Sequence, residues 1–178
     1  MREKIIVKSM IDEKVFWDFS YFNVFGLSWQ NKALITLFPL FMIGMAVWNM
    51  LTGGVALGIC FAVIGVAYPI SYILYFRHSI KQQITKFGLA EAKNFYTCTL
   101  SAEGLHVQND NSEVDWPWEK MFRVFVLDKY VYTYASKQRG FIMPLADLQE
   151  GATVEDLMEM LRAHLSKNQL ADKRKHKV

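Results

Sequence analysis

One apolar stretch decides how this chain folds, and it runs from Ala33 to Phe76: ALITLFPLFMIGMAVWNMLTGGVALGICFAVIGVAYPISYILYF. It contains no Asp, Glu, Lys, Arg or His, and Thr52-Gly53-Gly54 interrupts it once. A helix needs roughly 20 apolar residues to cross the core of a bilayer. The stretch therefore predicts two transmembrane helices, Ala33–Leu51 and Val55–Phe76, which form a hairpin over residues 32–76.

The charges beside this hairpin predict its orientation. Lys32 comes directly before the first helix, and Arg77, His78 and Lys81 follow the second, whereas the connecting turn carries no charge. Lys and Arg resist translocation, so both chain termini are expected in the cytosol and the turn outside. About thirty polar and aromatic residues precede the stretch, which does not suit a cleaved signal peptide. The expected location is the inner (cytoplasmic) membrane, with two passes.

The overall composition suits a hydrophobic insert in an otherwise soluble sequence. Hydrophobic residues make up 52% of the chain, charged residues make up 21%, and the formal net charge is +3. This charge is too small to argue for nucleic acid as a partner. Cys60 lies in the second apolar helix and Cys98 in the polar part, so no disulfide is expected and a reducing compartment fits.

Small residues in the hairpin predict close helix packing. Gly54, Gly58 and Ala62 share one face of the second helix, and Gly44 and Ala46 give the first helix a small patch. The contact is expected either within the hairpin or between two copies of the chain, which would then form a homo-oligomer. The absence of Asp, Glu, Lys, Arg and His from both helices argues against a transport path.

The segments beside the hairpin, residues 1–31 and 77–94, are expected to lie close to the membrane. Lys4–Lys8 has the pattern of a strand, and Asp12 can cap a helix over Glu13–Phe25. This helix is rich in aromatic rings, which favours the headgroup region, although it could also pack on the cytosolic domain. Residues 77–94 are expected to extend the second span as a basic helix, with Gly88 weakening it.

Residues 95–166 predict a strand-rich cytosolic domain. Short β-type runs separated by turn residues indicate an antiparallel sheet of about six strands, and the longest run is Trp118–Leu127. Thr153 and Asp156 form the pattern of a capping box at the start of a last amphipathic helix, which should close the sheet. The basic tail, residues 167–178, is expected to be disordered, either adhering to anionic lipid or solvated.

Several short motifs carry a resemblance to a known family. They are Glu103-Gly104-Leu105, Trp118-Glu119-Lys120-Met121, Tyr130-Val131-Tyr132 and Phe141-Ile142-Met143-Pro144. Together with the order of segments, they resemble the YcxB-like family of bacterial membrane proteins. The resemblance implies a membrane-tethered domain of pleckstrin-homology-like (PH-like) shape. It implies no catalytic residue.

Catalytic and metal-binding patterns are absent from the sequence. The four histidines have no spacing typical of metal ligands, and no phosphate-binding loop or nucleophile elbow appears. The chain is therefore expected not to be an enzyme and to need no cofactor or metal. The favoured function is an interaction or regulatory module that presents the PH-like domain at the inner leaflet to lipid or to an unidentified protein. The alternative is an accessory subunit of a transporter or channel that acts through its two spans.

A basic and aromatic surface beside the membrane is the candidate site for this interaction. It would contact anionic lipid or a partner protein, or else its residues serve only to set topology and depth. For Trp116, within Trp116-Pro117-Trp118, the other interpretation is an anchor in the sheet. The residues proposed for contact are Trp17, Tyr21, Trp29, Arg77, Lys81, Lys86 and Trp116.

Overall fold

The computed structural model describes residues 3–136 and 139–174, and its chain forms two compact units. The hairpin unit is one continuous segment, Phe16–Ala90. The β unit combines Met1–Val15 with Glu91–Val178. The expected N-terminal segment 1–31 is thus divided between the two units, because its strand pairs with strands from the far side of the hairpin.

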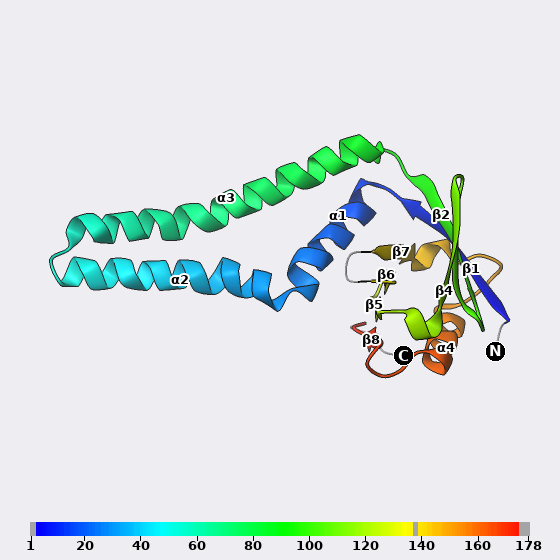
Figure 1. Cartoon of the computed structure of the whole chain (residues 1–178). Coiled ribbons are helices and arrows are strands. Elements are labelled where there is room, and N and C mark those ends of the chain that lie inside the picture. Colours follow the sequence, from blue (N-terminus) through cyan, green and yellow to red (C-terminus); the bar gives the residue numbers. More distant parts are fainter. Residues whose placement is uncertain (1–2, 137–138, 175–178) are drawn as a thin grey trace. The chain divides into compact units, whose positions relative to one another are not determined.

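Two long helices dominate the hairpin unit. They are α2, Trp29–Leu51, and α3, Val55–Phe87, and they lie side by side in opposite directions (Figure 1). Both are long and apolar enough to cross a membrane. The prediction of two long apolar helices in a hairpin is therefore confirmed. They are preceded by α1, Glu13–Tyr21, and by the π-helical segment η1, Phe22–Leu27.

The ends of these helices follow local capping chemistry. Asp12 caps α1 as predicted, since its Oδ1 accepts a hydrogen bond from Val15 N at 2.7 Å. Ser28 caps α2 through a bond from Asn31 N to its Oγ at 3.2 Å. At the other end of the hairpin unit, Gly88 has φ +62° and its N–H bonds to Thr85 O, so α3 stops at Phe87. The prediction of a helix as far as residue 94 was wrong, because Gly88 terminates that helix.

Small residues bring α2 and α3 together. Gly58 and Ala46 are buried, and a Cβ added to Gly58 would lie 3.0 Å from Ala46 O. A Cβ added to Gly65 would lie 3.3 Å from Pro39 O, so the contact continues along the hairpin. A Cβ added to Gly44 would meet nothing within 4 Å. Gly44 therefore takes no part in this packing, whereas Ala46 of the same predicted patch meets the second helix.

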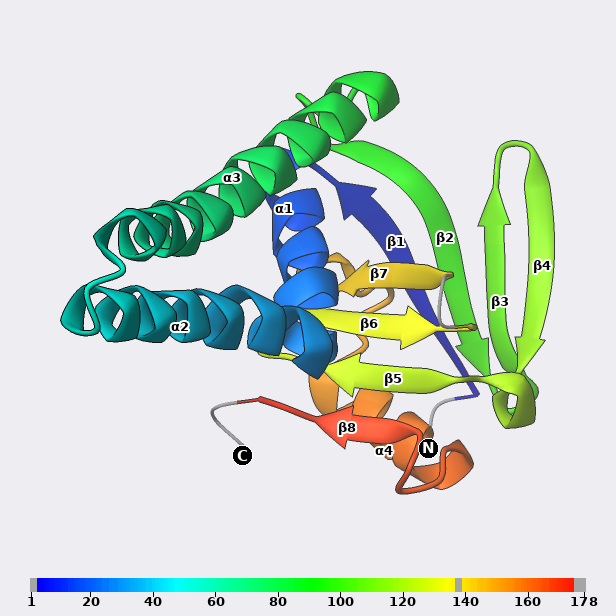
Figure 2. The same ribbon diagram turned by 60° about the vertical axis from the view of Figure 1, so that its left-hand side comes forward.

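The β unit contains two sheets of four strands each. In the first sheet all neighbours are antiparallel, in the order β1 (Lys4–Ile11), β2 (Lys93–Ser101), β3 (Gly104–Asn109) and β4 (Ser112–Pro117). The second has the order β7 (Gly140–Pro144), β6 (Tyr130–Tyr134), β5 (Arg123–Val126) and β8 (Leu170–Asp172). The strands of the two sheets run in clearly different directions (Figure 2).

The first and second strands show where the hairpin enters the β unit. They pair along their whole length, from Lys4 opposite Ser101 to Ile11 opposite Lys93. Residues 12–92 therefore leave β1 and return to β2 at the same end of this strand pair. The hairpin is an insertion between two neighbouring strands of one sheet.

Three sequence predictions for the β unit were wrong. The expected single antiparallel sheet of about six strands is two sheets of four strands, because β1 joins from before the hairpin and β8 joins from after α4. The run Trp118–Leu127 is not one strand, because Trp118–Lys120 forms a 3-10 turn in which Trp118 is buried and its Nε1 donates to Ser101 O at 3.0 Å. The tail is not disordered over Leu170–Asp172, because this segment pairs in parallel with β5. Lys175 and Lys177 of that tail lie outside the described residues.

The core of the β unit is shared by both sheets and by the last helix, α4 (Val154–His164). Leu157 and Leu161 of this helix are fully buried among Val124, Leu100 and other strand residues. The predicted capping box is present, with Asp156 N donating to Thr153 Oγ1 and Thr153 N donating to Asp156 Oδ2. A C-terminal helix that closes antiparallel strands is thus confirmed.

Candidate functional site

A row of aromatic rings holds α1 and η1 against α3 within the hairpin unit. The ring centres of Phe16 and Phe87 are 6.1 Å apart, those of Trp17 and Phe76 are 5.9 Å apart, and those of Phe25 and Phe76 are 5.5 Å apart. All three pairs are edge to face, the arrangement that ring quadrupoles favour. The helix that was predicted from its aromatic residues is therefore fixed on α3 by several of those same rings.

The π-helical segment η1 turns the chain from α1 into α2. Its wider turn is closed by Asn31, whose Nδ2 donates to Val24 O at 3.3 Å. The same residue donates its backbone N–H to the Ser28 cap, so a single residue joins η1 to the start of α2. π-Helical turns occur mostly as single insertions and frequently at functional sites. Here the turn places Phe25 between α1 and α2.

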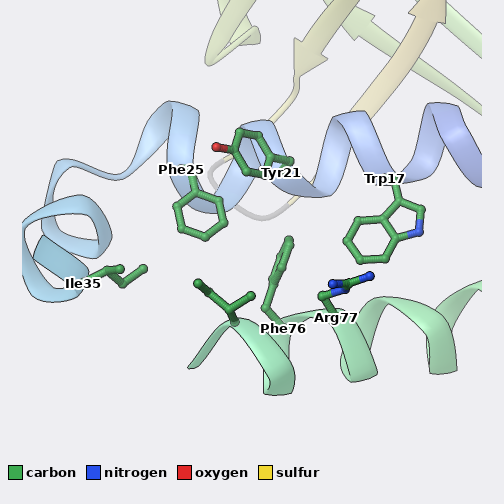
Figure 3. A pocket seen from close by; sticks show the side chains of 7 residues that line it. Trp17, Tyr21, Phe25, Ile35, Phe76 and Arg77 are labelled. Carbon is green, nitrogen blue, oxygen red and sulfur yellow. The ribbon is translucent and has the colours of Figure 1, made fainter. Parts of the chain in front are cut away.

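A groove of about 500 Å³ lies between α1, η1 and the facing parts of α2 and α3. Figure 3 shows its side chains, with Ile35 at one end and Trp17 and Arg77 at the other. The volume is within the range of about 300–1,000 Å³ that is usual for small-molecule sites. The lining residues are Trp17, Tyr21, Phe25, Ile35, Ile73, Phe76 and Arg77.

The groove is amphipathic along its length. Phe25, Ile35 and Ile73 make one part entirely apolar, whereas Arg77 brings a permanent positive charge to the other part. The phenol of Tyr21 and the indole N–H of Trp17 are the remaining polar groups in the lining. No carboxylate is among these seven residues, so the charge of the lining is purely cationic.

The structure brings together three of the seven residues that the sequence proposed for lipid or partner contact: Trp17, Tyr21 and Arg77. Trp29 is 75% exposed at the start of α2 and does not line the groove. Lys81 and Lys86 are exposed on α3 and also lie outside the lining. Trp116 belongs to the β unit, on strand β4.

Trp116 has a polar environment of its own. Its ring is 5.6 Å from the Arg139 guanidinium, and within the described part of the chain its buried Nε1 has no hydrogen-bond acceptor. It lines a hollow of about 390 Å³ with His106 and Asp115, whose Nδ1 and Oδ1 are 2.7 Å apart. His106 Nε2 is also 3.3 Å from Glu113 Oε1. These contacts join neighbouring positions of β3 and β4, so they stabilise that strand pair.

Strand β2 carries two titratable groups near the core of the β unit, the buried Cys98 and the partly buried Tyr96. Burial raises the pKa of the Cys98 thiol to about 12, which keeps it protonated and unreactive at neutral pH. Burial also raises the pKa of Tyr96, whose hydroxyl accepts a hydrogen bond from Ile142 N. Both groups stabilise the sheets in their neutral forms and belong to the β unit, whereas the groove residues belong to the hairpin unit.

Four groove residues were not placed in the site by the sequence: Phe25, Ile35, Ile73 and Phe76. Phe25 was recognised only as one aromatic residue of the N-terminal helix, and the others were assigned to the spans. One signal was available, because Ile73, Phe76 and Arg77 follow the i, i+3, i+4 spacing of a single helix face. The partners of that face could not be identified, since they come from η1 and α2.

Comparisons of the chain with protein-family models, with curated proteins and with solved structures gave no match.

Proposed function

We propose that the chain is a membrane-anchored interaction or regulatory module and not an enzyme. In this proposal α2 and α3 span the inner membrane, both termini are cytosolic, and the β unit is presented to a protein or lipid partner at the inner leaflet. The proposal includes the resemblance to YcxB-like proteins and a PH-like shape for the β unit. It assigns no catalytic residue, cofactor or metal.

The observation that carries the proposal is the insertion of the hairpin between β1 and β2. Only Asp12 separates β1 from α1, and residues 88–92 separate α3 from β2. A membrane hairpin placed there would hold the β unit through two short connections, both at the same end of the paired strands β1 and β2. Such a double attachment limits how far the β unit can move from the membrane, which suits a module that acts on partners at the bilayer surface.

The arrangement of the β unit supports the PH-like part of the proposal. Strands β1 to β4 form one antiparallel sheet, β5 to β7 form a second antiparallel group, and α4 follows. Strand β8 follows α4 in the chain, pairs with β5 and adds a fourth strand to the second sheet. A fold alone does not fix an activity. The proposal therefore names a class of function and leaves the partner to experiment.

Replacement of the spans tests whether they only anchor the module. Residues 37–71 are exchanged for an unrelated two-span hairpin, which keeps the groove residues Ile35, Ile73, Phe76 and Arg77 in place. Partners are then captured by cross-linking in native membranes from the exchanged and unchanged chains. We expect the same partners with both chains, and loss of all partners from a correctly inserted exchange would contradict the proposal.

The alternative, an accessory subunit that acts through its spans, predicts the reverse outcome. Gly44 offers the matched variant, since a side chain added there meets nothing within the chain. Gly44→Leu should leave the hairpin folded and the partners unchanged if the spans only anchor. If the spans contact a channel or transporter, Gly44→Leu should weaken capture of that partner in parallel with the hairpin exchange.

Reporter fusions test the topology directly. A reporter that works only in the cytosol should be active after Val178, and one placed at Gly53 should be inactive. The opposite pattern would contradict the membrane orientation and, with it, the presentation of the β unit at the inner leaflet.

A further inference from the structure

We propose that the groove between α1, η1 and α3 binds one anionic phospholipid, with its phosphate at Arg77 and an acyl chain along Phe25, Ile35 and Ile73. The inference deepens the proposed function and depends on its membrane placement of the hairpin. The whole groove lies within the hairpin unit.

The chemistry of the groove matches an amphipathic occupant. A small polar ligand would leave the apolar part unfilled, and a purely apolar ligand would leave the Arg77 charge without a partner. A phospholipid supplies both an apolar chain and a charged oxygen cluster. The guanidinium of arginine presents a planar fork of donors that matches phosphate oxygens, and the pairs it forms are stronger than neutral hydrogen bonds.

The position of the groove along the spans agrees with the layers of a bilayer. Arg77 directly follows the apolar stretch, and Ile73 lies one helical turn, or about 6 Å, deeper in the span. Ile35 lies three residues inside Lys32 on the neighbouring helix. The charged part of the groove is therefore at headgroup depth, and its apolar part is at the depth of the upper acyl chains. Trp17 and Tyr21 are of the types that favour this boundary.

The charge of the lining favours an anionic headgroup over a zwitterionic one. Its single charged residue is Arg77, and His78 and Lys81 follow within one turn of the same helix. A zwitterionic lipid would bring its own ammonium group into this cationic surrounding. An anionic lipid such as phosphatidylglycerol avoids that repulsion, so the structure predicts a preference for it.

The rigidity of the walls makes the groove a pre-formed site. Phe25 is held on both sides, with its ring centre 5.5 Å from that of Phe76 and 4.7 Å from that of Tyr21. Trp17 is held in turn by Phe76. Walls fixed by such contacts lose little side-chain entropy when a ligand enters, and this favours tight retention of one lipid over loose annular contact.

The test uses the full chain in detergent micelles that contain equal amounts of dioleoyl phosphatidylglycerol and dioleoyl phosphatidylethanolamine. Native mass spectrometry counts the lipids that remain bound after the detergent is removed. We expect one phosphatidylglycerol per chain for the unchanged protein. Arg77→Gln should lower this retention about tenfold, since a hydrogen bond to a charged group is lost.

Lys86→Gln is the matched control for this variant. It removes the same charge from an exposed position of the same helix that does not line the groove, so retention should not change. A second pair tests the apolar part. Ile73→Trp should fill the groove and displace the lipid, whereas Ile70→Trp, at an exposed position of α3 outside the lining, should not.

Three outcomes would overturn the inference. They are equal retention by the Arg77→Gln and Lys86→Gln variants, equal retention of the two lipids by the unchanged chain, and a second copy of the chain that occupies the groove in place of lipid. None of these results depends on the partners of the β unit. Failure of the groove is therefore seen in lipid retention, and failure of the anchoring proposal is seen in the reporter fusions and the captured partners.

Discussion

The core of the β unit and the contact between α2 and α3 bury different kinds of residue. In the β unit, large apolar side chains such as Leu100, Val124 and Leu161 are at most 1% exposed. In the hairpin, small residues allow the close approach of α2 and α3, with Gly58 and Ala46 buried, while Leu57 is 59% exposed. A soluble core is stabilised by removing large apolar groups from water, whereas helices in lipid gain from close backbone approach. The α2–α3 contact therefore has the small-residue packing that is typical of membrane helices, whereas the β unit is packed as a soluble core is.

The largest expected effect comes from the same truncation made in each unit. Leu161→Ala should lower the free energy of unfolding of the β unit by about 2–5 kcal/mol, because it leaves a cavity in a fully buried position. Leu57→Ala should change stability by no more than about 0.5 kcal/mol, since that side chain has few neighbours to lose. Urea unfolding of the full chain in micelles, followed by near-ultraviolet circular dichroism, measures both. Equal losses would mean that the two units do not differ as described.

The reverse change, from small to large, should affect the hairpin. A Cβ added to Gly58 would lie 2.7 Å from Met50 Cγ, so Gly58→Leu should cost about 1–3 kcal/mol through overpacking. Gly44→Leu is the matched control, because a Cβ there has open space. Thermal loss of helical signal in micelles measures the two variants. An equal effect of both would contradict the packing of α2 on α3 through Gly58.

The hairpin could be predicted from the sequence more fully than the β unit could. Charged residues mark both ends of the apolar stretch, so Lys32 and Arg77 bound the apolar parts of the two helices without any knowledge of tertiary contacts. Strand β8 gives no such local signal. It is held by Gln169, whose Nε2 donates to Trp118 O and Met121 O at 3.2 and 2.7 Å, about fifty residues away along the chain.

The groove could be predicted only in part for a related reason. Trp17, Tyr21 and Arg77 are of the types that are common at the ends of membrane spans, so the sequence identified them. Ile35 and Ile73 are ordinary residues for a span, and composition does not tell which of them faces a groove. The rotation of each helix about its own axis decides which residues face the groove. Contacts such as that between Gly58 and Ala46 set this rotation. The same limit explains why Gly44 and Gly58 were given one role although only Gly58 packs in the hairpin.

A smaller effect is expected where the two sheets of the β unit meet. The Tyr96 hydroxyl on β2 accepts a bond from Ile142 N on the edge strand β7 and donates to Ile142 O at 3.3 Å. Tyr96→Phe removes both bonds and leaves a backbone N–H without its partner, at a cost of about 1–2 kcal/mol. Tyr75→Phe in α3, where the side chain is 72% exposed, should cost almost nothing. Urea unfolding in micelles compares the two, and an equal effect would show that Tyr96 does not join the sheets.

The smallest expected effect is a dependence of stability on pH that the buried Cys98 produces in the β unit. Its thiol has a pKa of about 12 in the folded chain against 9.0 ordinarily, because burial disfavours the thiolate. The folded state therefore keeps a proton that the unfolded state releases. The contribution of the thiol to the free energy of unfolding is complete below pH 9, and it is lost as pH rises from about 9 towards about 12. Between pH 8 and pH 10 the loss should be about 1 kcal/mol.

Cys98→Ala should remove this part of the pH dependence while the part from buried tyrosines remains. Unfolding measured at both pH values decides the matter, and identical pH slopes for the two chains would mean that the thiol is not shielded from water as the structure places it.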